Sequence, residues 1–302
     1  MIVIQNAKLG TLSNYIGRPL ALLFALDVAI AAAYVFGGWK WLSLPDVPLS
    51  IFGGVIGVLA GFRNASAYAR WWEARIIWGT IVNCSRNFAR EVLTMIEGPE
   101  ASSELNQVKR KLVLLQIAYV NALGNHLRGI PPWPSLKGLI PEHEVECLKG
   151  EANVPLAIQH RMASIVAECY QQGWIDNMRW VALDRTLTGL MESQGASERI
   201  KNTPMPRMYD LFIRLFISIF CLLLPLGMVD SLGMLTPFGS TLVGFTFMAL
   251  DKIGRDLETP FENLPNDISL CAISRTIEIN LKQMIGEREI PEPLAPVDGI
   301  LW

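Results

Sequence analysis

The stretch VPLSIFGGVIGVLAGF, residues 47–62, decides the fold class, because it carries no charge and ends abruptly at Arg63-Asn64. A long uncharged apolar segment is typical of a helix that spans a membrane. At about sixteen residues it is shorter than the ~20 that cross a bilayer core. We therefore expect the helix to continue beyond the lipid into Tyr68 and Trp71-Trp72.

Three further segments have the same character. The first, Pro19–Trp39, ends in Trp39-Lys40-Trp41, and such a basic and aromatic sequence is typical of a membrane interface. The other two, Leu211–Val229 and Ser231–Leu250, are separated only by Asp230, which predicts a tight hairpin. The turn between the first two spans is expected at Pro45, Asp46 and Pro48. The sequence thus predicts four transmembrane helices.

The composition supports a membrane protein. Of the 302 residues, 51% are apolar and 18% charged, against about 25% charged in soluble domains, and the mean hydropathy is +0.31. The formal charge of −2 offers no basic excess for nucleic acid. No HExxH, Walker, GxSxG or Rossmann pattern occurs, so neither an enzyme nor a bound cofactor is predicted. The five cysteines form no CxxC pair and are expected to be free thiols.

Between the second and third spans the chain is soluble in character, with apolar residues at helical spacing. The predicted organisation is all-α. Residues 1–62 form an N-terminal segment with transmembrane helices 1 and 2, residues 63–208 a cytosolic helical region, residues 209–250 a hairpin of transmembrane helices 3 and 4, and residues 251–302 a C-terminal cytosolic segment. Nearly all Lys and Arg lie in the termini and the middle region, so the positive-inside rule places both termini in the cytoplasm.

Small residues recur along the second span at intervals of four. One set is Gly53, Gly57 and Gly61, and the set one residue further on is Gly54, Val58 and Phe62. A small face lets membrane helices approach closely, and on spacing alone packing within one chain is the commoner explanation. The alternative is a pore, in which several copies pack through the glycines. Val58 and Phe62 would then form rings around an axis, and such apolar rings gate ions by dewetting.

Asp27 lies inside the first span, where a charge is costly and is a functional candidate by default. One interpretation pairs it with Arg214, close to the cytoplasmic start of the third span. The other leaves Arg214 at the membrane interface, where long basic side chains extend toward water, and gives Asp27 a hydrogen bond inside the bundle. The sequence leaves both open.

Two acidic clusters are candidate metal sites, each with a plainer explanation. Glu142-His143-Glu144 with Glu146 and Cys147 lies in a polar stretch, where a solvated surface is the favoured interpretation because neighbouring helical residues do not face each other. The second cluster follows the last span and comprises Asp251, Asp256, Glu258, Glu262 and Asp267. Oxygen ligands in such a loop are able to hold calcium. The interleaved prolines favour a solvated linker instead, and no metal is predicted.

Three blocks of sequence, in this order, resemble the bacterial branch of the bestrophin family. They are Gly61-Phe62-Arg63-Asn64 with Tyr68-Ala69-Arg70-Trp71-Trp72-Glu73-Ala74-Arg75, then Asp184-Arg185-Thr186-Leu187 through Pro204-Met205-Pro206, then Pro260-Phe261-Glu262 through Arg275-Thr276-Ile277-Glu278. The resemblance covers nearly the whole chain. It implies a homopentameric ion channel of the inner membrane with four spans per subunit and one axial pore. Its partners would be copies of itself, small monovalent ions and the lipid bilayer.

The resemblance also implies two constrictions. The family has a neck of three apolar side chains on the second span, which fall here on Gly54, Val58 and Phe62. Gly54 stands where the family usually has a bulkier residue, which predicts a wider or wetter outer ring. A cytosolic constriction is typical of the family, and its candidates here are Ile175 and Met178. The calcium clasp of animal members uses consecutive acidic residues, and the broken cluster in this chain argues against calcium gating.

The predicted function is passive flow of small monovalent ions through the neck. Selectivity between anions such as chloride and cations stays open, because the neck carries neither basic nor acidic residues. An ion-coupled secondary transporter that uses Asp27 is one alternative, although repeated halves and broken helices, typical of transporters, are not apparent. A non-conducting, membrane-anchored sensor whose middle region binds a partner is the other.

Overall fold

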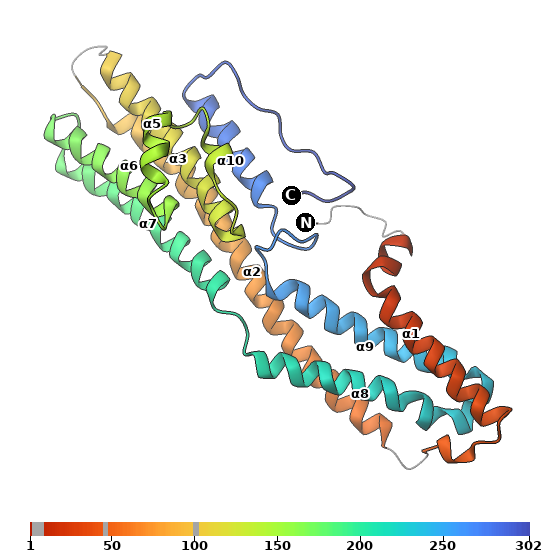
Figure 1. Cartoon of the computed structure of the whole chain (residues 1–302). Coiled ribbons are helices and arrows are strands. Elements are labelled where there is room, and N and C mark those ends of the chain that lie inside the picture. Colours follow the sequence, from red (N-terminus) through yellow and green to blue (C-terminus); the bar gives the residue numbers. More distant parts are fainter. Residues whose placement is uncertain (2–8, 45–47, 99–102) are drawn as a thin grey trace. The chain divides into compact units, whose positions relative to one another are not determined.

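The computed structural model describes residues 1, 9–44, 48–98 and 103–302, and over these ranges it contains helices and no strand (Figure 1). The all-α prediction is therefore confirmed. The turn expected at Pro45 and Asp46 lies outside the described residues. The long helices are α1 (Leu9–Val35), α2 (Leu49–Met95), α3 (Ser103–Arg128), α6 (Val154–Gln171), α7 (Asn177–Asn202), α8 (Arg207–Leu232), α9 (Thr236–Glu258) and α10 (Leu270–Met284). The short ones are η1 (Lys40–Leu42), α4 (Trp133–Leu136), α5 (Glu142–Leu148) and η2 (Gly233–Leu235).

The chain divides into two compact units. Unit 1 comprises Met1–Val3, Trp72–Thr203 and Pro260–Trp302, and unit 2 comprises Ile4–Trp71 and Pro204–Thr259. Helix α2 contributes to both. Its sequence from Arg63 to Met95 contains no proline that would break the backbone hydrogen bonds, which explains a single helix of 47 residues. The predicted continuation past Phe62 is confirmed and extends well beyond Trp72.

Unit 2 is a bundle in which α1, α8 and α9 lie side by side with the first half of α2 (Figure 1). Its core joins side chains from three of these helices: Leu23 of α1, Ile56 of α2, and Ile213, Ile217, Phe220, Cys221 and Leu224 of α8. Gly244 of α9 lies against the Leu23 side chain, so that a Cβ there would collide with it. This close approach of α1 and α9 illustrates how small residues let membrane helices pack.

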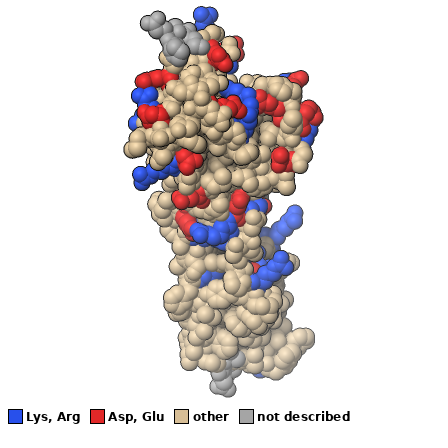
Figure 2. Space-filling model, turned by 90° about the vertical axis from the view of Figure 1, so that its left-hand side faces the viewer, with Lys and Arg blue, Asp and Glu red and all other residues tan. Residues whose placement is uncertain are grey.

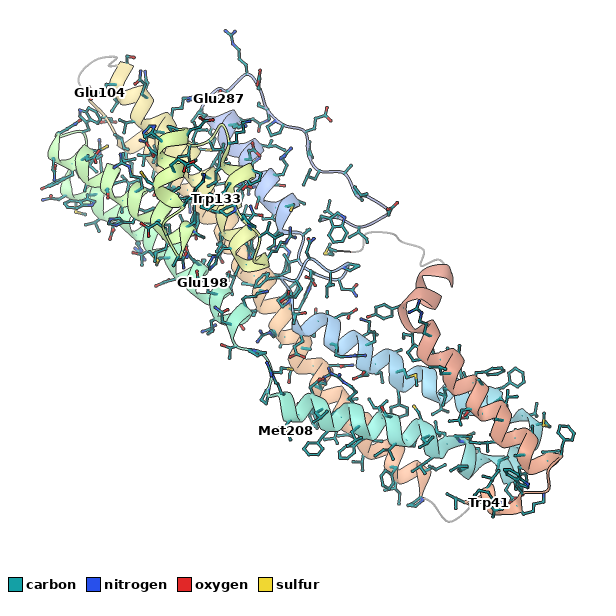
Figure 3. The ribbon with its side chains drawn as sticks, viewed as in Figure 1. Trp41, Glu104, Trp133, Glu198, Met208 and Glu287 are labelled. Carbon is teal, nitrogen blue, oxygen red and sulfur yellow. The ribbon has the colours of Figure 1, made fainter. Side chains whose placement is uncertain are left out.

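The ends of these helices match the sequence patterns, with small shifts. The first span was expected to reach Trp39, but α1 ends at Val35, and Gly38 follows with a φ of +68°. Trp39 and Trp41 then stack with ring centroids 6.1 Å apart, both exposed, as an interfacial anchor requires. The expected hairpin is present, because α8 passes into α9 through η2. Met208, at the start of α8, and Trp41 lie at opposite ends of unit 2 (Figure 3).

Three stretches are long and apolar enough to cross a membrane: Tyr15–Val35, Leu49–Met95 and Arg207–Glu258. The last contains both α8 and α9, so it corresponds to two of the four predicted spans. Their outward faces carry large apolar side chains, among them Leu22, Phe24, Leu211, Phe238 and Leu242. Figure 2 shows a broad area of one face that displays neither basic nor acidic residues. Such a surface suits contact with lipid rather than water.

Unit 1 is built around α3, which packs against α6, α7 and α10. Most of α3 between Leu112 and Leu127 is buried, because this helix is covered on nearly all sides. Trp78 of α2 is fully buried, and its ring lies near Gly124 of α3. Gln116 of α3 donates to the Ser85 hydroxyl at 2.9 Å, so this core also contains buried polar contacts. Trp133 of α4 and Glu198 of α7 both belong to this unit (Figure 3).

Candidate pore-lining site

The first half of α2 has two distinct faces within unit 2. Ile56, Ala60, Arg63 and Ala67 are buried, at the spacing of four, three and four residues that marks one side of a helix. This side meets the rest of the bundle through Ile56, which belongs to the core shared with α1 and α8. The opposite side is not covered by any of the described residues of the chain.

The three neck candidates lie on the uncovered side. The Val58 side chain is 59% exposed and that of Phe62 is 66% exposed, and within the described ranges no other part of the chain lies within 4 Å of where a Gly54 Cβ would be. Large apolar side chains in this position are costly in water and mark a surface that contacts lipid or other protein. The geometry therefore leaves Val58 and Phe62 free to line a shared axis.

The three helix-packing candidates have different surroundings: Gly53 faces another helix of its own chain, and the other two do not. A Cβ built on Gly53 would lie 3.0 Å from Cζ of Phe220, so Gly53 allows close packing of α2 on α8 within the chain. At Gly57 and Gly61, no atom of another described element lies within 4 Å of such a Cβ. Packing within one chain therefore explains Gly53 and not the other two.

A buried cluster of charges follows Phe62 directly. The Arg63 side chain is 1% exposed, and its Nη1 donates to Oδ1 of Asp251 on α9 at 2.7 Å. Its Nη2 forms an ion pair with Asp210 on α8. Asp251 also pairs with Arg255 at 2.9 Å and Asp210 with Arg214, so each carboxylate is shared by two guanidinium groups.

Sequence reasoning missed this cluster, although it quoted Arg63 as the residue that ends the second span. A signal was present: Asp210 directly precedes the third predicted span and Asp251 directly follows the fourth, and the predicted topology puts both on the same side as Arg63. A buried charge needs a partner of opposite sign. Asp210 and Asp251 were therefore the candidate partners of the Arg63 side chain.

Beside this cluster, Gly254→Ala is expected to destabilise the protein. A Cβ at Gly254 would collide with the Asn64 amide, whose Nδ2 donates to the main-chain oxygen of Leu250 at 2.9 Å. Overpacking of this kind costs about 1–3 kcal/mol. The thermal unfolding midpoint in mild detergent measures the effect. Gly195→Ala on α7 is the matched control, because no atom of the described residues lies within 4 Å of a Cβ at this exposed helical glycine; equal midpoints for the two variants would contradict the prediction.

Asp27 is fully buried in unit 2 and does not pair with Arg214. Its Oδ2 accepts a hydrogen bond from the Thr241 hydroxyl of α9 at 3.1 Å. Arg214 instead pairs with Asp210 on its own helix. The interpretation with a hydrogen bond inside the bundle is confirmed, and the pairing with Arg214 was wrong because Arg214 has a carboxylate one turn away.

The acidic cluster after the last span is not the solvated linker that its prolines suggested. Asp251 and Asp256 belong to α9 and are buried, and Asp256 pairs with Lys252 at 2.8 Å. Glu262 pairs with Lys201 at 2.6 Å. Asp267 is buried, and its Oδ2 accepts from the backbone N–H of Leu264 at 3.0 Å. The interpretation was wrong because α9 continues as a helix to Glu258, beyond the apolar segment.

Burial raises the pKa of Asp267 from 3.8 to about 6, even though backbone N–H groups stabilise its charged form. The folded state therefore binds more protons than the unfolded state between these values, and this contribution to stability is lost as the pH rises through 6. The difference between these two pKa values corresponds to roughly 3 kcal/mol in the free energy of unfolding. Asp267→Asn is expected to unfold at a higher temperature than the parent at pH 7.5, with the gain disappearing at pH 4. Parallel pH profiles of the two midpoints would contradict this.

The candidates for the cytosolic constriction, both in unit 1, lie in different environments. Ile175 is 4% exposed, just before α7, so its side chain belongs to the core. Met178 is 79% exposed in the first turn of α7, and Val181, also exposed, follows one turn on. A side chain that lines a pore must face water, which argues against Ile175 and leaves Met178. The spacing of apolar residues did not reveal this difference in exposure, because Ile175 and Met178 are both large apolar residues in the sequence.

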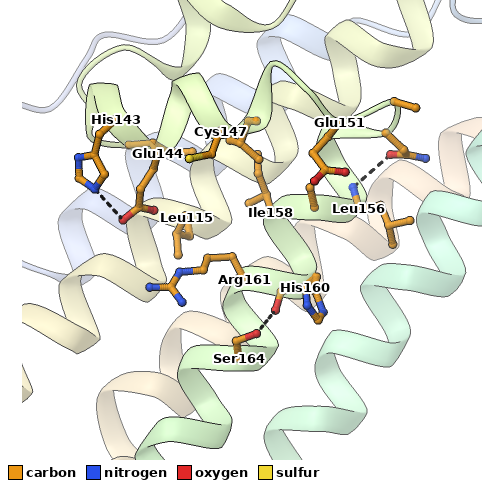
Figure 4. Close-up of a pocket in the computed structure, with 15 residues that line it drawn as sticks. Leu115, His143, Glu144, Cys147, Glu151, Leu156, Ile158, His160, Arg161 and Ser164 are labelled. Carbon is orange, nitrogen blue, oxygen red and sulfur yellow. Dashed lines mark hydrogen bonds and ion pairs between the residues drawn. The ribbon is translucent and has the colours of Figure 1, made fainter.

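A cavity of about 830 Å³ opens between α5 and α6 in unit 1 (Figure 4). Leu115, Ile140 and Ile158 supply apolar walls, and the rim carries His143, Cys147, His160 and Arg161. Glu144 is engaged by Lys111 at 2.5 Å, and Arg161 lies 3.5 Å from Glu168. Across the described residues, no three His, Cys, Asp or Glu side chains converge as metal ligands would. The cysteines at 84, 147, 169, 221 and 271 are free thiols.

The fold and the apolar face of α2 define an all-helical membrane protein, and comparisons with known proteins identify its family. The model of the bacterial and fungal bestrophin proteins matches residues 6–283, so the chain belongs to the bestrophin family. This membership confirms the resemblance in sequence and the prediction that the chain is not an enzyme.

Individual relatives support the same family assignment. A voltage-dependent anion channel-forming protein of Ralstonia nicotianae is 32% identical over 276 residues, which cover 91% of this chain and 89% of the relative. One of the same description from a Nostoc species is 34% identical over 230 residues, covering 76% of this chain and 74% of the relative. The crystal structure of a bacterial bestrophin homolog from Klebsiella pneumoniae matches with a TM-score of 0.83 and 28% identity, over 89% of this chain and 98% of the other.

Proposed function

We propose that this chain forms a homopentameric channel that passes small monovalent ions through a neck lined by Gly54, Val58 and Phe62. The exposed apolar side of α2 carries the proposal: Val58 and Phe62 stand on a face that none of the residues described in the structure covers. In an assembly with these faces around one axis, their side chains form apolar rings that water leaves readily, and an ion crosses only when the rings are wetted.

Assembly accounts for the remaining small residues. Gly57 and Gly61 have open space beside them in one subunit, which suits the close approach of a neighbouring α2. The first half of α2, helix α1 and the α8–α9 hairpin would supply four spans per subunit in the inner membrane. Both termini and residues 63–208 would then lie in the cytoplasm, with 251–302 beside them.

The cytosolic constriction is proposed at Met178, with Val181 one helical turn further on, instead of Ile175. Both side chains are exposed on α7, and an apolar pair at a spacing of three lies on one face of a helix. A ring of flexible methionine side chains would narrow the path without fixing its width.

Anions are the permeant class that the names of the relatives favour, since those proteins are described as anion channel-forming. The neck candidates themselves are uncharged, so they offer no ring of basic or acidic side chains to select by sign. Selectivity would therefore arise outside the neck.

Reconstitution of the purified protein in planar bilayers under asymmetric potassium chloride tests the proposal. A channel gives unitary currents, and a reversal potential near the chloride equilibrium potential identifies an anion channel. A reversal near the potassium potential would overturn the anion assignment alone. Saturable flux without unitary currents would indicate a transporter, and neither signal would indicate a sensor. The mass of the detergent complex measures the number of subunits, and a monomer would exclude the shared pore.

A further inference from the structure

The cluster around Arg63 lies one residue from the inner end of the proposed neck. Residues turn by roughly 100° around a helix for each step along it. Phe62 and Arg63 are carried by the same rigid turn of α2, one exposed and the other buried. A rotation of α2 that takes Arg63 away from its partners therefore turns Phe62 by the same angle.

The contacts of Arg63 join α2 to two other helices at once. Nη1 of its guanidinium group meets the carboxylate of Asp251 on α9 and Nη2 meets that of Asp210 on α8, while Nη1 also lies 3.4 Å from the main-chain oxygen of Asp251. Asn64 adds a second link to α9 through the oxygen of Leu250. The planar fork of a guanidinium group has fixed donor directions, so the two carboxylates define one orientation of the side chain.

Stability alone does not explain a charged residue here. Apolar side chains at this position would be buried as well as Ile56 and Ala60 are, and replacing buried ion pairs by apolar residues is often neutral or stabilising. Apolar contact is non-directional, however, and lets a helix rotate or slide between similar packings. Ion pairs with fixed geometry select one of these packings.

We propose that Arg63 is a positioning residue for the neck: held between Asp210 and Asp251, it fixes the rotation of α2 so that Val58 and Phe62 face the pore axis. The inference rests on the proposed channel function. Loss of the Arg63 contacts leaves a conducting assembly in which the apolar rings no longer have one defined orientation.

A double-mutant cycle on single-channel conductance tests the role of Arg63. Phe62→Ala is compared with the parent, and the same change is made in an Arg63→Lys background. Lysine keeps the charge but lacks the fork that meets two carboxylates. We expect Phe62→Ala to raise conductance several-fold in the parent and to have a clearly smaller effect in the Arg63→Lys background, because the ring is then already displaced. The full effect in both backgrounds overturns the positioning role and leaves the neck assignment intact.

Two further measurements keep the outcomes distinct. Arg75→Lys makes the same change at an exposed residue of α2 outside the cluster, and it should leave the effect of Phe62→Ala unchanged. If Arg63→Lys fails to assemble, Asp210→Asn replaces it, since this less buried carboxylate is removed without adding bulk. If Phe62→Ala has no effect even in the parent, the proposed neck is wrong, and the positioning role falls with it.

Discussion

Single-channel conductance is expected to rise several-fold in Phe62→Ala. The Phe62 side chain is the largest of the neck candidates, and it stands on the uncovered side of α2. An aromatic ring from every subunit would form the narrowest apolar constriction, which expels water and thereby excludes ions. Truncation to a methyl group widens this constriction, so the energetic barrier to a hydrated ion falls. Recordings from the reconstituted protein in symmetric salt measure the change.

Phe52→Ala is the matched control for this experiment. It removes the same ring from an exposed position of the same helix, ten residues earlier and on a different face. Its conductance should equal that of the parent. Unchanged currents in Phe62→Ala, or equal increases in both variants, would show that Phe62 does not line the path.

Loss of assembly is the expected result for Gly57→Leu. Among the described residues of one subunit, nothing lies within 4 Å of a Cβ at this position, so the start of a larger side chain meets no contact there. If neighbouring pore helices approach through this face, a leucine on every subunit holds them apart and removes close contacts over the whole ring. Detergent-solubilised protein should then run at the mass of a monomer and give no unitary currents.

The same substitution at Gly53 separates the two kinds of packing. Gly53 faces the Phe220 ring of its own chain, so Gly53→Leu should lower the thermal unfolding midpoint of the subunit. Gly57→Leu should retain the helical circular dichroism of the parent while losing its assembly. A stable oligomer of parental size in Gly57→Leu would contradict the proposed interface.

The glycine series of α2 shows what a sequence pattern predicts and what it does not. The glycine series at 53, 57 and 61 is one pattern in sequence, yet in the structure Gly53 contacts α8 while Gly57 and Gly61 face open space. A period of four reports which residues share a side of a helix, and it does not report what lies opposite. Ile175 and Met178 illustrate the same limit, since similar apolar side chains three residues apart are buried in one case and exposed in the other.

The sequence alone determined that this protein is helical, apolar over several membrane-length segments and a bestrophin, because hydrophobic periodicity, span length and local motifs are properties of consecutive residues. The tertiary structure alone decided that Arg63 is buried between Asp210 and Asp251 and that Asp27 bonds to Thr241. Arg63 and Asp251 are 188 residues apart in the chain, and Asp27 and Thr241 are 214 apart. Only the packing of whole helices brings such groups together, and burial then makes each unpaired charge costly enough to require its partner.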